Sequence, residues 1–231
     1  MSLNNEIIAL LKQEGCSIVG FADLRCLSKE ARQNFDYGIL IALSYSKEAM
    51  QDNKYGLPQR YYEEFTPINK RLPELAVQIA NFLIDKGYKA LAKTTPTVVQ
   101  DEDYRTVLPH KTLATLAGVG WIGKCALLVT KKVGSALRLT VVLTNAPLDC
   151  GMPVTESICA PDCTICSEIC PAKAPLGRLW EVGIDRDSFF NAHACRPAAR
   201  NHAKVTLGIE ETLCGLCISN CPFTKRGLGY E

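Results

Sequence analysis

The chain has 231 residues, of which 47% are hydrophobic and 22% are charged, which suffices for one sizeable hydrophobic core and excludes a disordered protein. Its formal net charge is +2, from 26 Lys and Arg against 24 Asp and Glu, which excludes a broad basic surface for nucleic acid or anionic membrane. The 12 cysteines are unevenly distributed: Cys16, Cys26 and Cys125 precede residue 150, and the other nine follow from there onward.

The N-terminal sequence lacks the basic start of a secretion signal, and the longest apolar stretches have the length of strands. We therefore expect a cytoplasmic protein with no membrane segment. In that compartment cysteines stay reduced, which argues against a disulfide scaffold as the reason for their number.

Hydrophobic periodicity predicts the elements in chain order. Apolar residues at helical spacing indicate an opening helix that ends before Gly15 and a long amphipathic helix over 69–86 that ends at Gly87. A shorter helix is expected over 111–117, and stretches rich in β-branched residues and Leu predict strands over 17–22, 37–43, 88–92, 125–130 and 137–144.

The pattern changes near residue 150. From there the strand signal disappears, and short helical pieces alternate with Pro, Gly and Cys. The fold class is therefore α+β, with a mixed α/β domain over 1–149 and a small, mostly helical domain over 150–231.

A glycine-rich segment, Gly118-Val119-Gly120-Trp121-Ile122-Gly123-Lys124, matches G-x-G-x-x-G and the first positions of a phosphate loop. Both motifs require a strand before the glycines and a helix after them, because the helix N-terminus holds the phosphate. Here a helix is expected before and a strand after, which disfavours nucleotide binding. The glycines still indicate a close backbone approach, either to a packed neighbour or to a flat cofactor.

The cysteines of the second segment follow a strong pattern. Two runs of the form Cys-x2-Cys-x3-Cys-Pro are each preceded by one further cysteine, Cys159 or Cys195. In each group of four, three thiolates serve one [4Fe-4S] cluster and the last cysteine serves the partner cluster. This spacing predicts crossed ligation, with one cluster on Cys159, Cys163, Cys166 and Cys221 and the other on Cys170, Cys195, Cys214 and Cys217. The interval between Cys159 and Cys163 is one residue longer than the usual two, and we expect a wider loop at Pro161 to absorb it.

Two other interpretations apply to the same cysteines. Structural zinc also takes four thiolates, but usually from two separated Cys-x2-Cys pairs without the terminal Cys-Pro. Clusters with a purely structural role are the second alternative, and any cluster in so small a domain also stabilises it.

Taken together, these residues resemble the epoxyqueuosine reductases and their shorter relatives, cobalamin-dependent iron–sulfur proteins akin to reductive dehalogenases. The resemblance covers nearly the whole chain. It rests on the order of the cluster cysteines and on five stretches, which are 15–22, Tyr61-Tyr62, Lys86-Gly87-Tyr88, 113–129 and 144–148.

The resemblance implies a nitroreductase-like α/β domain that binds cobalamin and a ferredoxin-like domain whose two clusters feed electrons to cobalt, with Co(I) as the reactive species. An external low-potential electron donor would serve it, and the substrate would be a small molecule or a modified nucleoside, or the partner would be a corrinoid protein. The residues that it places near the corrin are Gly118, Gly120, Trp121, Ile122, Gly123, Lys124 and Cys125.

Three departures from the family pattern bear on function. Thr95 precedes Pro96 where the family has an Asp that donates a proton, so the nearby candidates for that role are Asp101, Asp103, Tyr104 and His110. Relatives that act on tRNA usually continue into a helical-repeat domain, whereas this sequence ends at Glu231; together with the low net charge this makes tRNA a doubtful substrate. Cys125 stands where relatives often have Asn or Ser, either as packing or facing the cofactor.

The leading hypothesis is an iron–sulfur oxidoreductase that passes electrons through two [4Fe-4S] clusters to cobalamin for a reductive reaction. The main alternative is a non-catalytic electron-transfer protein or corrinoid reductase that serves a partner protein. A third possibility is a ferredoxin with two clusters fused to a nucleotide- or flavin-binding domain.

Overall fold

The computed structural model describes residues 1–94 and 98–231 and divides into two compact units. The first comprises Met1–Ser44, Pro67–Val119 and Arg138–Val154, and the second comprises Tyr45–Thr66, Gly120–Leu137 and Thr155–Glu231. The second unit therefore contains two earlier segments in addition to the cysteine-rich one. The predicted division into domains at residue 150 stays a prediction.

The first unit is built on a four-stranded sheet in the order β1-β2-β6-β3. Strands β1 and β2 are antiparallel, with Ile18 opposite Ala42, and β3 and β6 are antiparallel, with Ala90 opposite Thr144. Its elements are α1 (Leu3–Gln13), β1 (Ile18–Asp23), β2 (Tyr37–Ser44), β3 (Ala90–Lys93), α4 (His110–Leu116) and β6 (Leu137–Thr144), together with most of α3 (Gln59–Asp85).

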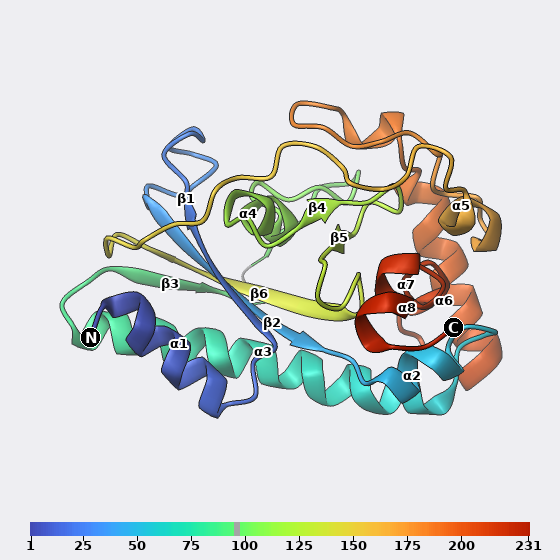
Figure 1. Cartoon of the computed structure of the whole chain (residues 1–231), viewed down its shortest axis with the longest axis horizontal. Coiled ribbons are helices and arrows are strands. Elements are labelled where there is room, and N and C mark those ends of the chain that lie inside the picture. The colour runs from blue at the N-terminus through green and yellow to red at the C-terminus, as the bar shows by residue number, and fades with distance from the viewer. Residues whose placement is uncertain (95–97) are drawn as a thin grey trace. The chain divides into compact units, whose positions relative to one another are not determined.

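Alternate residues of the strands pack on opposite faces, as the two-residue period of a strand requires. Phe21, Ile39 and Ile41 belong to the core shared with α1 and α3. On the other face Gly20 and Gly38 leave room for α4 and the residues after it, because a side chain at Gly38 would meet Leu113. The sheet thus lies between α1 and α3 on one side and α4 on the other (Figure 1).

The sequence predictions for this unit are largely confirmed. The opening helix, the strands at 17–22, 37–43 and 137–144, and the helix before the glycines all form within one or two residues of the expected positions. The long helix is an exception at its start: it begins at Gln59, ten residues before the expected position, and continues through Pro67 and Pro73.

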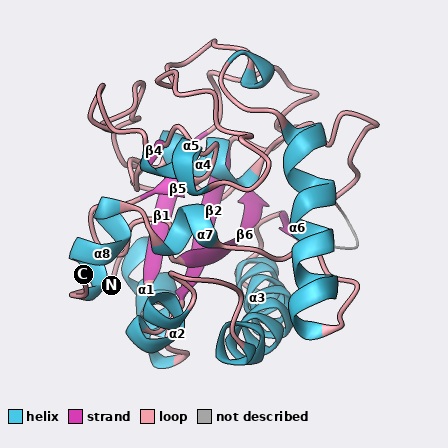
Figure 2. Cartoon of the chain, turned by 90° about the vertical axis from the view of Figure 1, so that its right-hand side faces the viewer, coloured by secondary structure: helices cyan, strands magenta, loops and turns pink. Residues whose placement is uncertain are grey.

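The second unit has little regular structure apart from one long helix, α6, as Figure 2 shows. The N-terminal cap of α6 is Asn191, whose side chain accepts a hydrogen bond from the Ala194 backbone at 2.9 Å. The elements of this unit are α2 (Lys47–Asp52), β4 (Trp121–Ile122), β5 (Leu128–Val129), α5 (Ile165–Ile169), a 3₁₀ turn (Arg186–Ser188), α6 (Ala192–Leu207), α7 (Leu216–Ser219) and α8 (Pro222–Leu228).

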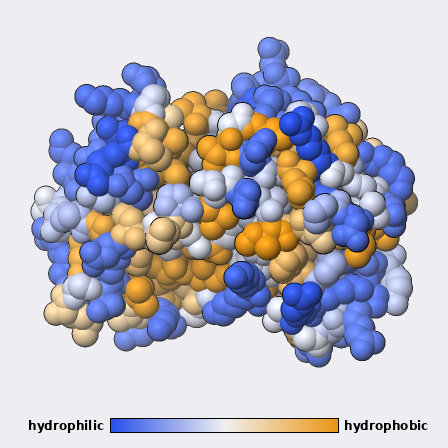
Figure 3. Space-filling view, turned by 45° about the horizontal axis from the view of Figure 1, so that its top comes forward, coloured by the Kyte–Doolittle hydropathy of each residue, from blue (hydrophilic) through white to orange (hydrophobic). Residues whose placement is uncertain are grey.

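Across the described residues, no helix is both long enough and apolar enough to cross a membrane. On the face shown in Figure 3, hydrophobic residues are interspersed with hydrophilic ones. In the second unit, three exposed aliphatic residues lie on or near α5, namely Ile158, Ile165 and Ile169.

Candidate metal centre

A short hairpin carries most of the glycine-rich segment. Strands β4 and β5 are antiparallel, and hydrogen bonds from Gly123 N to Leu127 O at 2.9 Å and from Ala126 N to Gly123 O at 2.8 Å close the turn between them. Ala126 has a φ of 59°, in the left-handed region that costs a residue with a side chain about 1–2 kcal/mol. The turn is thus held in a strained conformation, and it presents Lys124 and Cys125.

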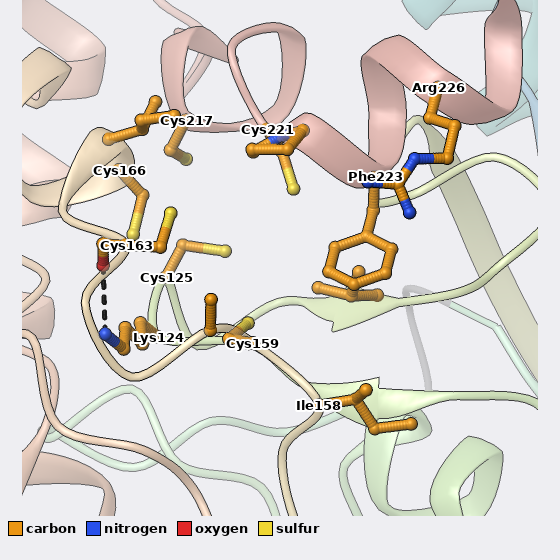
Figure 4. A pocket seen from close by; sticks show the side chains of 15 residues that line it. Lys124, Cys125, Ile158, Cys159, Cys163, Cys166, Cys217, Cys221, Phe223 and Arg226 are labelled. Carbon is orange, nitrogen blue, oxygen red and sulfur yellow. Dashed lines mark hydrogen bonds between the residues drawn. The ribbon is translucent and has the colours of Figure 1, made fainter.

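The hairpin turn forms one wall of a cavity of about 220 Å³ within the second unit. Figure 4 shows sulfur atoms from three separate segments arranged around this space. They come from the turn, from the first cysteine run and from the second. The cysteines that line the cavity are Cys125, Cys159, Cys163, Cys166, Cys217 and Cys221.

The four cysteines predicted for the first cluster all line this cavity. Burial and the neighbouring thiols, including those of Cys125, Cys159, Cys163 and Cys221, raise the pKa of Cys166 to about 12. These thiols therefore lie close enough together to interact electrostatically. Cys217, predicted for the other cluster, also lines the cavity.

The four cysteines predicted for the second cluster are also mutual neighbours. Burial, followed by the thiols of Cys170 and Cys214, raises the pKa of Cys195 to about 11. The pKa of Cys217 is raised by a side-chain hydrogen bond with Cys125, which stabilises the protonated Cys217 thiol, and by burial, with smaller contributions from the neighbouring thiols, including Cys214 and Cys195. Cys170, Cys195 and Cys214 do not line the cavity of the first set.

The chemistry of this cavity fits an iron–sulfur cluster. All 12 cysteines are free thiols, and those in the cavity offer soft sulfur ligands. The cavity is smaller than the roughly 300–1,000 Å³ typical of small-molecule sites, which favours a compact inorganic group. Among residues 1–94 and 98–231, no three His, Cys, Asp or Glu side chains are arranged to hold a single metal ion. A cubane cluster makes a different demand, since each of its four irons takes one thiolate.

Lys124 has a role that the sequence did not reveal. Its ammonium group donates hydrogen bonds to the backbone carbonyls of Pro161 at 2.8 Å and Cys163 at 2.9 Å, and the residue is only 3% exposed. Lys124 thereby fastens the wider loop between Cys159 and Cys163. The signal in the sequence was limited to a lysine within an otherwise apolar segment.

The glycines of the segment are explained by packing within the chain. Gly118 has a φ of +70°, and a Cβ there would lie 2.5 Å from the Met152 carbonyl oxygen. A Cβ at Gly120 would lie 2.1 Å from the Val129 carbonyl oxygen, and one at Gly123 would lie 2.7 Å from the Val129 side chain. The close backbone approach predicted from the sequence therefore occurs against protein neighbours, and the predicted corrin contact stays a prediction.

Trp121 and Ile122 are both buried in the second unit. The Trp121 ring packs edge-to-face against Phe223 with centroids 4.7 Å apart, and Ile122 packs with Ala126 and Phe189. Within the described part of the chain, the Trp121 indole N–H has no hydrogen-bond acceptor. Among the side chains of the predicted corrin-contacting segment, it is the buried nitrogen or oxygen atom without a partner, since Lys124 is bonded to two carbonyls.

The order of elements around the glycines matches the expectation. Helix α4 precedes them, and strand β5 (Leu128–Val129) follows them, shorter than the strand expected over 125–130; the short strand β4 (Trp121–Ile122) lies within the segment itself. No helix N-terminus therefore follows Gly123 to receive a phosphate, which agrees with the interpretation against a phosphate loop.

The four candidates for a proton donor belong to the first unit, and none lines the cysteine cavity. The Asp101 carboxylate accepts hydrogen bonds from the backbone of Asp103 at 3.0 Å and Arg105 at 2.7 Å, so it stabilises an exposed turn, in which Tyr104 has a φ of 59°. Thr95, which stands at the position of the family's acid, lies outside the described residues.

His110 occupies a more confined place than the other candidates. It begins α4, and its Nδ1 lies 3.3 Å from the Leu139 carbonyl oxygen. Burial lowers its pKa, with smaller contributions from other groups that include Lys93. Its Nε2 is buried and has no hydrogen-bond partner among the described residues.

The chain resembles known proteins in sequence and in fold. A scan against protein-family models finds no match. The chain is 32% identical over 198 residues to an epoxyqueuosine reductase of Gloeobacter violaceus, covering 81% of this chain and 56% of that protein. It is 29% identical over 191 residues to the epoxyqueuosine reductase of Atelocyanobacterium thalassa, covering 81% of this chain and 58% of that protein.

The chain is thus similar to epoxyqueuosine reductases over as much as 81% of its length. It spans little more than half the length of those two relatives. Among solved structures, it matches an epoxyqueuosine reductase bound to an epoxyqueuosine-modified tRNA stem loop with a TM-score of 0.63, at 20% identity, covering 96% of this chain and 65% of that one. It also matches a reductive dehalogenase described as B12-dependent with a TM-score of 0.68, at 18% identity, covering 94% of this chain and 31% of that one. This epoxyqueuosine reductase-like chain therefore has the mixed α/β fold of both groups.

Proposed function

We propose that this chain is an iron–sulfur oxidoreductase that passes single electrons through two [4Fe-4S] clusters to a bound corrinoid for a reductive reaction. The observation that carries the proposal is the thiol-lined cavity, in which cysteines from two distant runs meet. Cys221 shares the cavity with Cys159, Cys163 and Cys166, as crossed ligation requires.

Two clusters follow from the two sets of neighbouring thiols. The first would be held by Cys159, Cys163, Cys166 and Cys221. The second would be held by Cys170, Cys195, Cys214 and Cys217, whose thiols interact electrostatically with one another. In this proposal the second module is ferredoxin-like and the first is a nitroreductase-like cofactor module.

The protein's own residues would hold and shield the first cluster. Lys124 fixes the loop between Cys159 and Cys163, and the side chains of Val129 and Phe223 line the cavity beside the thiols. Such an apolar wall limits the access of water to a cluster and helps to set its reduction potential.

The corrinoid part of the proposal rests on similarity to known proteins and on one polar group. A matched reductive dehalogenase is described as B12-dependent. In this chain the unsatisfied indole N–H of Trp121 offers a hydrogen bond to a bound group, and leaving such a donor buried costs about 1–3 kcal/mol. When bound, the corrinoid would supply the reduced cobalt that acts on the substrate.

The substrate would be a modified nucleoside or another small molecule that accepts electrons. One matched structure contains a modified tRNA stem loop, which supports a nucleoside substrate. The net charge of +2 gives little general attraction to a polyanion, so contacts to tRNA beyond the nucleoside are not part of the proposal. His110, whose Nε2 is buried and whose pKa is lowered by burial, is the candidate proton carrier with the most confined environment. We place the protein in the cytoplasm, with a low-potential protein as electron donor.

The decisive experiment is anaerobic reconstitution with iron and sulfide, followed by iron, sulfide and cobalt analysis. We expect about eight irons per chain, as two cubane clusters require. When cobalamin is then added, its Co(II) electron paramagnetic resonance signal should differ from that of free cobalamin. Cys217→Ala should reduce the iron content to about four, whereas the control Cys26→Ala, at an exposed cysteine, should leave it at about eight. Unchanged iron in Cys217→Ala would refute the ligand assignment.

Substrate is tested separately from cofactors. The reconstituted protein is supplied with a strong chemical reductant and either an epoxyqueuosine-containing stem loop or the free nucleoside. Turnover of either would establish reductase activity, and faster turnover of the stem loop would add tRNA contacts to the site. Full cluster content and cobalamin binding without any turnover would argue for an electron-transfer protein instead.

A further inference from the structure

Two segments that are distant in the sequence form a basic patch on the second unit. The segment 131–135 packs against α8, because a side-chain carbon added at Gly227 would lie 2.5 Å from the Lys132 carbonyl oxygen (Figure 1). The Thr224 hydroxyl of α8 also accepts a hydrogen bond from the Ser135 backbone at 3.0 Å. The packing brings together four basic residues, which are Lys131, Lys132, Lys225 and Arg226.

The charge of this basic patch is not offset by neighbouring acids. The two stretches that surround it, 120–137 and 212–230, contain no Asp or Glu. Within the described part of the chain, the three basic residues other than Lys132 form no ion pair with a carboxylate. Glu231, which follows α8, is held by a lysine outside the patch, since the Lys54 ammonium donates to its backbone carbonyl oxygen at 2.6 Å.

The basic patch borders the thiol-lined cavity. Arg226 is exposed and also lines the cavity, so a single side chain separates solvent from the proposed site of the first cluster there. Its guanidinium carbon lies 5.5 Å from the centre of the Phe223 ring, which belongs to the same wall (Figure 4). Ile158 and Ile165 also line the cavity and are 49% and 38% exposed. The rim of the cavity therefore combines exposed apolar side chains with positive charge.

We propose that this rim and the basic patch form the docking site for an acidic, low-potential protein that donates single electrons to the first cluster. The inference rests on the proposed function, because it requires that cluster. In each transfer the flavin or iron–sulfur centre of the donor is oxidised by one electron and the cluster is reduced by one electron, with no bond formed or broken. The positive potential steers the acidic donor toward the cavity, where its redox centre comes close to the cluster.

The apolar part of the rim favours a protein partner over RNA. Protein interfaces combine an apolar centre with a polar rim, and those of electron-transfer complexes are small. Ile158 and Ile165 suit such a centre. Single-stranded RNA is held instead by aromatic side chains on which its bases stack. Phe223, the aromatic residue of the cavity wall, already packs against Trp121 and Arg226.

The test measures how fast a reduced plant-type [2Fe-2S] ferredoxin, which is an acidic protein, reduces the clusters of the reconstituted full chain in stopped flow. The patch variant replaces one lysine of each segment, Lys131→Glu with Lys225→Glu. The matched control, Lys12→Glu with Lys29→Glu, changes the net charge equally at exposed lysines of the first unit. At low salt the patch variant should be reduced about 10-fold or more slowly than the wild-type chain, and the control should stay close to the wild-type rate. Added salt should slow the wild-type reaction and leave the patch variant little changed.

Two further measurements separate the outcomes. Iron content should be about eight per chain in every variant, and the small uncharged photoreductant deazariboflavin should reduce all of them equally fast, which shows that the clusters are intact. The milder pair Lys131→Gln with Lys225→Gln should give an intermediate rate with ferredoxin.

Three results would overturn the inference. The first is equal rates with ferredoxin in the patch variant and its control, and the second is wild-type clusters that accept electrons from deazariboflavin but not from ferredoxin. The third is weaker binding of an epoxyqueuosine-containing stem loop by the patch variant with an unchanged rate of reduction by ferredoxin, which would assign the patch to RNA. Failure of the wild-type chain to assemble clusters would instead overturn the proposed function.

Discussion

The sheet region and the cysteine-rich segment are stabilised in different ways. One cluster of 14 buried residues joins the strands to α1 and α3 in the sheet region. Between Thr155 and Glu231, by contrast, only seven hydrophobic residues are buried, and three of them are alanines. The comparison indicates that the sheet region can fold on apolar burial alone, whereas the cysteine-rich segment requires another source of stability.

Specific polar contacts supply part of that stability. Asn53, which is fully buried, donates a hydrogen bond to the Ser219 hydroxyl at 3.1 Å and so holds α7. The Tyr230 hydroxyl donates to the Ser219 carbonyl at 2.5 Å. These contacts fix the second cysteine run, and the proposed clusters would supply the remainder.

Removal of iron should produce the largest effect and would test the comparison directly. Chelation of iron from the reconstituted protein should sharply reduce amide protection in α6 and α7, because metal binding contributes folding free energy there. Strand β2 should keep its protection, since its core contains no cysteine ligand. Hydrogen exchange before and after chelation measures both regions in one sample. Equal protection of α6 with and without iron would show that the segment folds without clusters.

A cavity in the sheet core should destabilise the sheet region and leave iron binding unchanged. Leu75 is fully buried on α3, and Leu75→Ala should lower the free energy of unfolding of the sheet region by about 2–5 kcal/mol. The control Val77→Ala changes a residue of the same helix that is 46% exposed, and should change stability by less than about 0.5 kcal/mol. Iron content should stay constant in both variants. A loss of iron in Leu75→Ala would show that the two regions depend on one another.

The sequence was informative where a simple period governs packing. Ile7 and Leu11 of α1 and the alternate residues of β2 face the aliphatic core, so both elements were predictable from their spacing. The cysteine spacing likewise predicts that thiols of the two runs meet, and the assignment of each thiol to a cluster stays a prediction. These features depend on local pattern, which a single sequence contains.

The sequence was uninformative where distant segments meet. The early start of α3 at Gln59 could not be predicted from the sequence, because Pro67 lies inside the helix and a proline there usually indicates a helix boundary. The buried contact between Asn53 and Ser219 joins residues 166 positions apart, and the bonds of Lys124 cross to a loop nearly 40 residues away. Such pairings arise from tertiary structure, and no periodicity indicates them.

Replacement of Lys124 should have an intermediate effect that appears in the cysteine-rich region alone. Lys124→Met should lower stability by about 1.5–3 kcal/mol, because it removes the charged donor from two carbonyls in a buried position. It should also slow cluster assembly by loosening the loop between Cys159 and Cys163. The control Lys131→Met replaces an exposed lysine on the same unit. The rate of cluster assembly, monitored by visible absorbance, distinguishes the two variants. Equal assembly rates would show that Lys124 does not support the cluster site.

The smallest effect is a dependence of stability on pH that differs between the sheet region and the cysteine-rich region. Burial raises the pKa of Cys16 in the sheet region, and that of Cys221 in the cavity, from 9.0 to about 11. A raised pKa means that the folded, metal-free chain binds more protons than the unfolded chain. Its stability is therefore complete below about pH 9 and falls as the pH rises toward 11.

Iron should reverse the direction of this pH dependence of stability in the cysteine-rich region only. The ligands bind iron as thiolates, so assembly releases protons and becomes more favourable as the pH rises. Cys221 then stays ionised at every working pH, so the cysteine-rich region no longer loses stability above pH 9. The contribution of Cys16 to the stability of the sheet region keeps the same pH dependence with or without iron. Thermal unfolding of the metal-free and reconstituted chains between about pH 7 and 10, each with Cys16→Ala as reference, measures both thiols. If the cysteine-rich region kept its alkaline loss of stability after reconstitution, Cys221 would not be a cluster ligand.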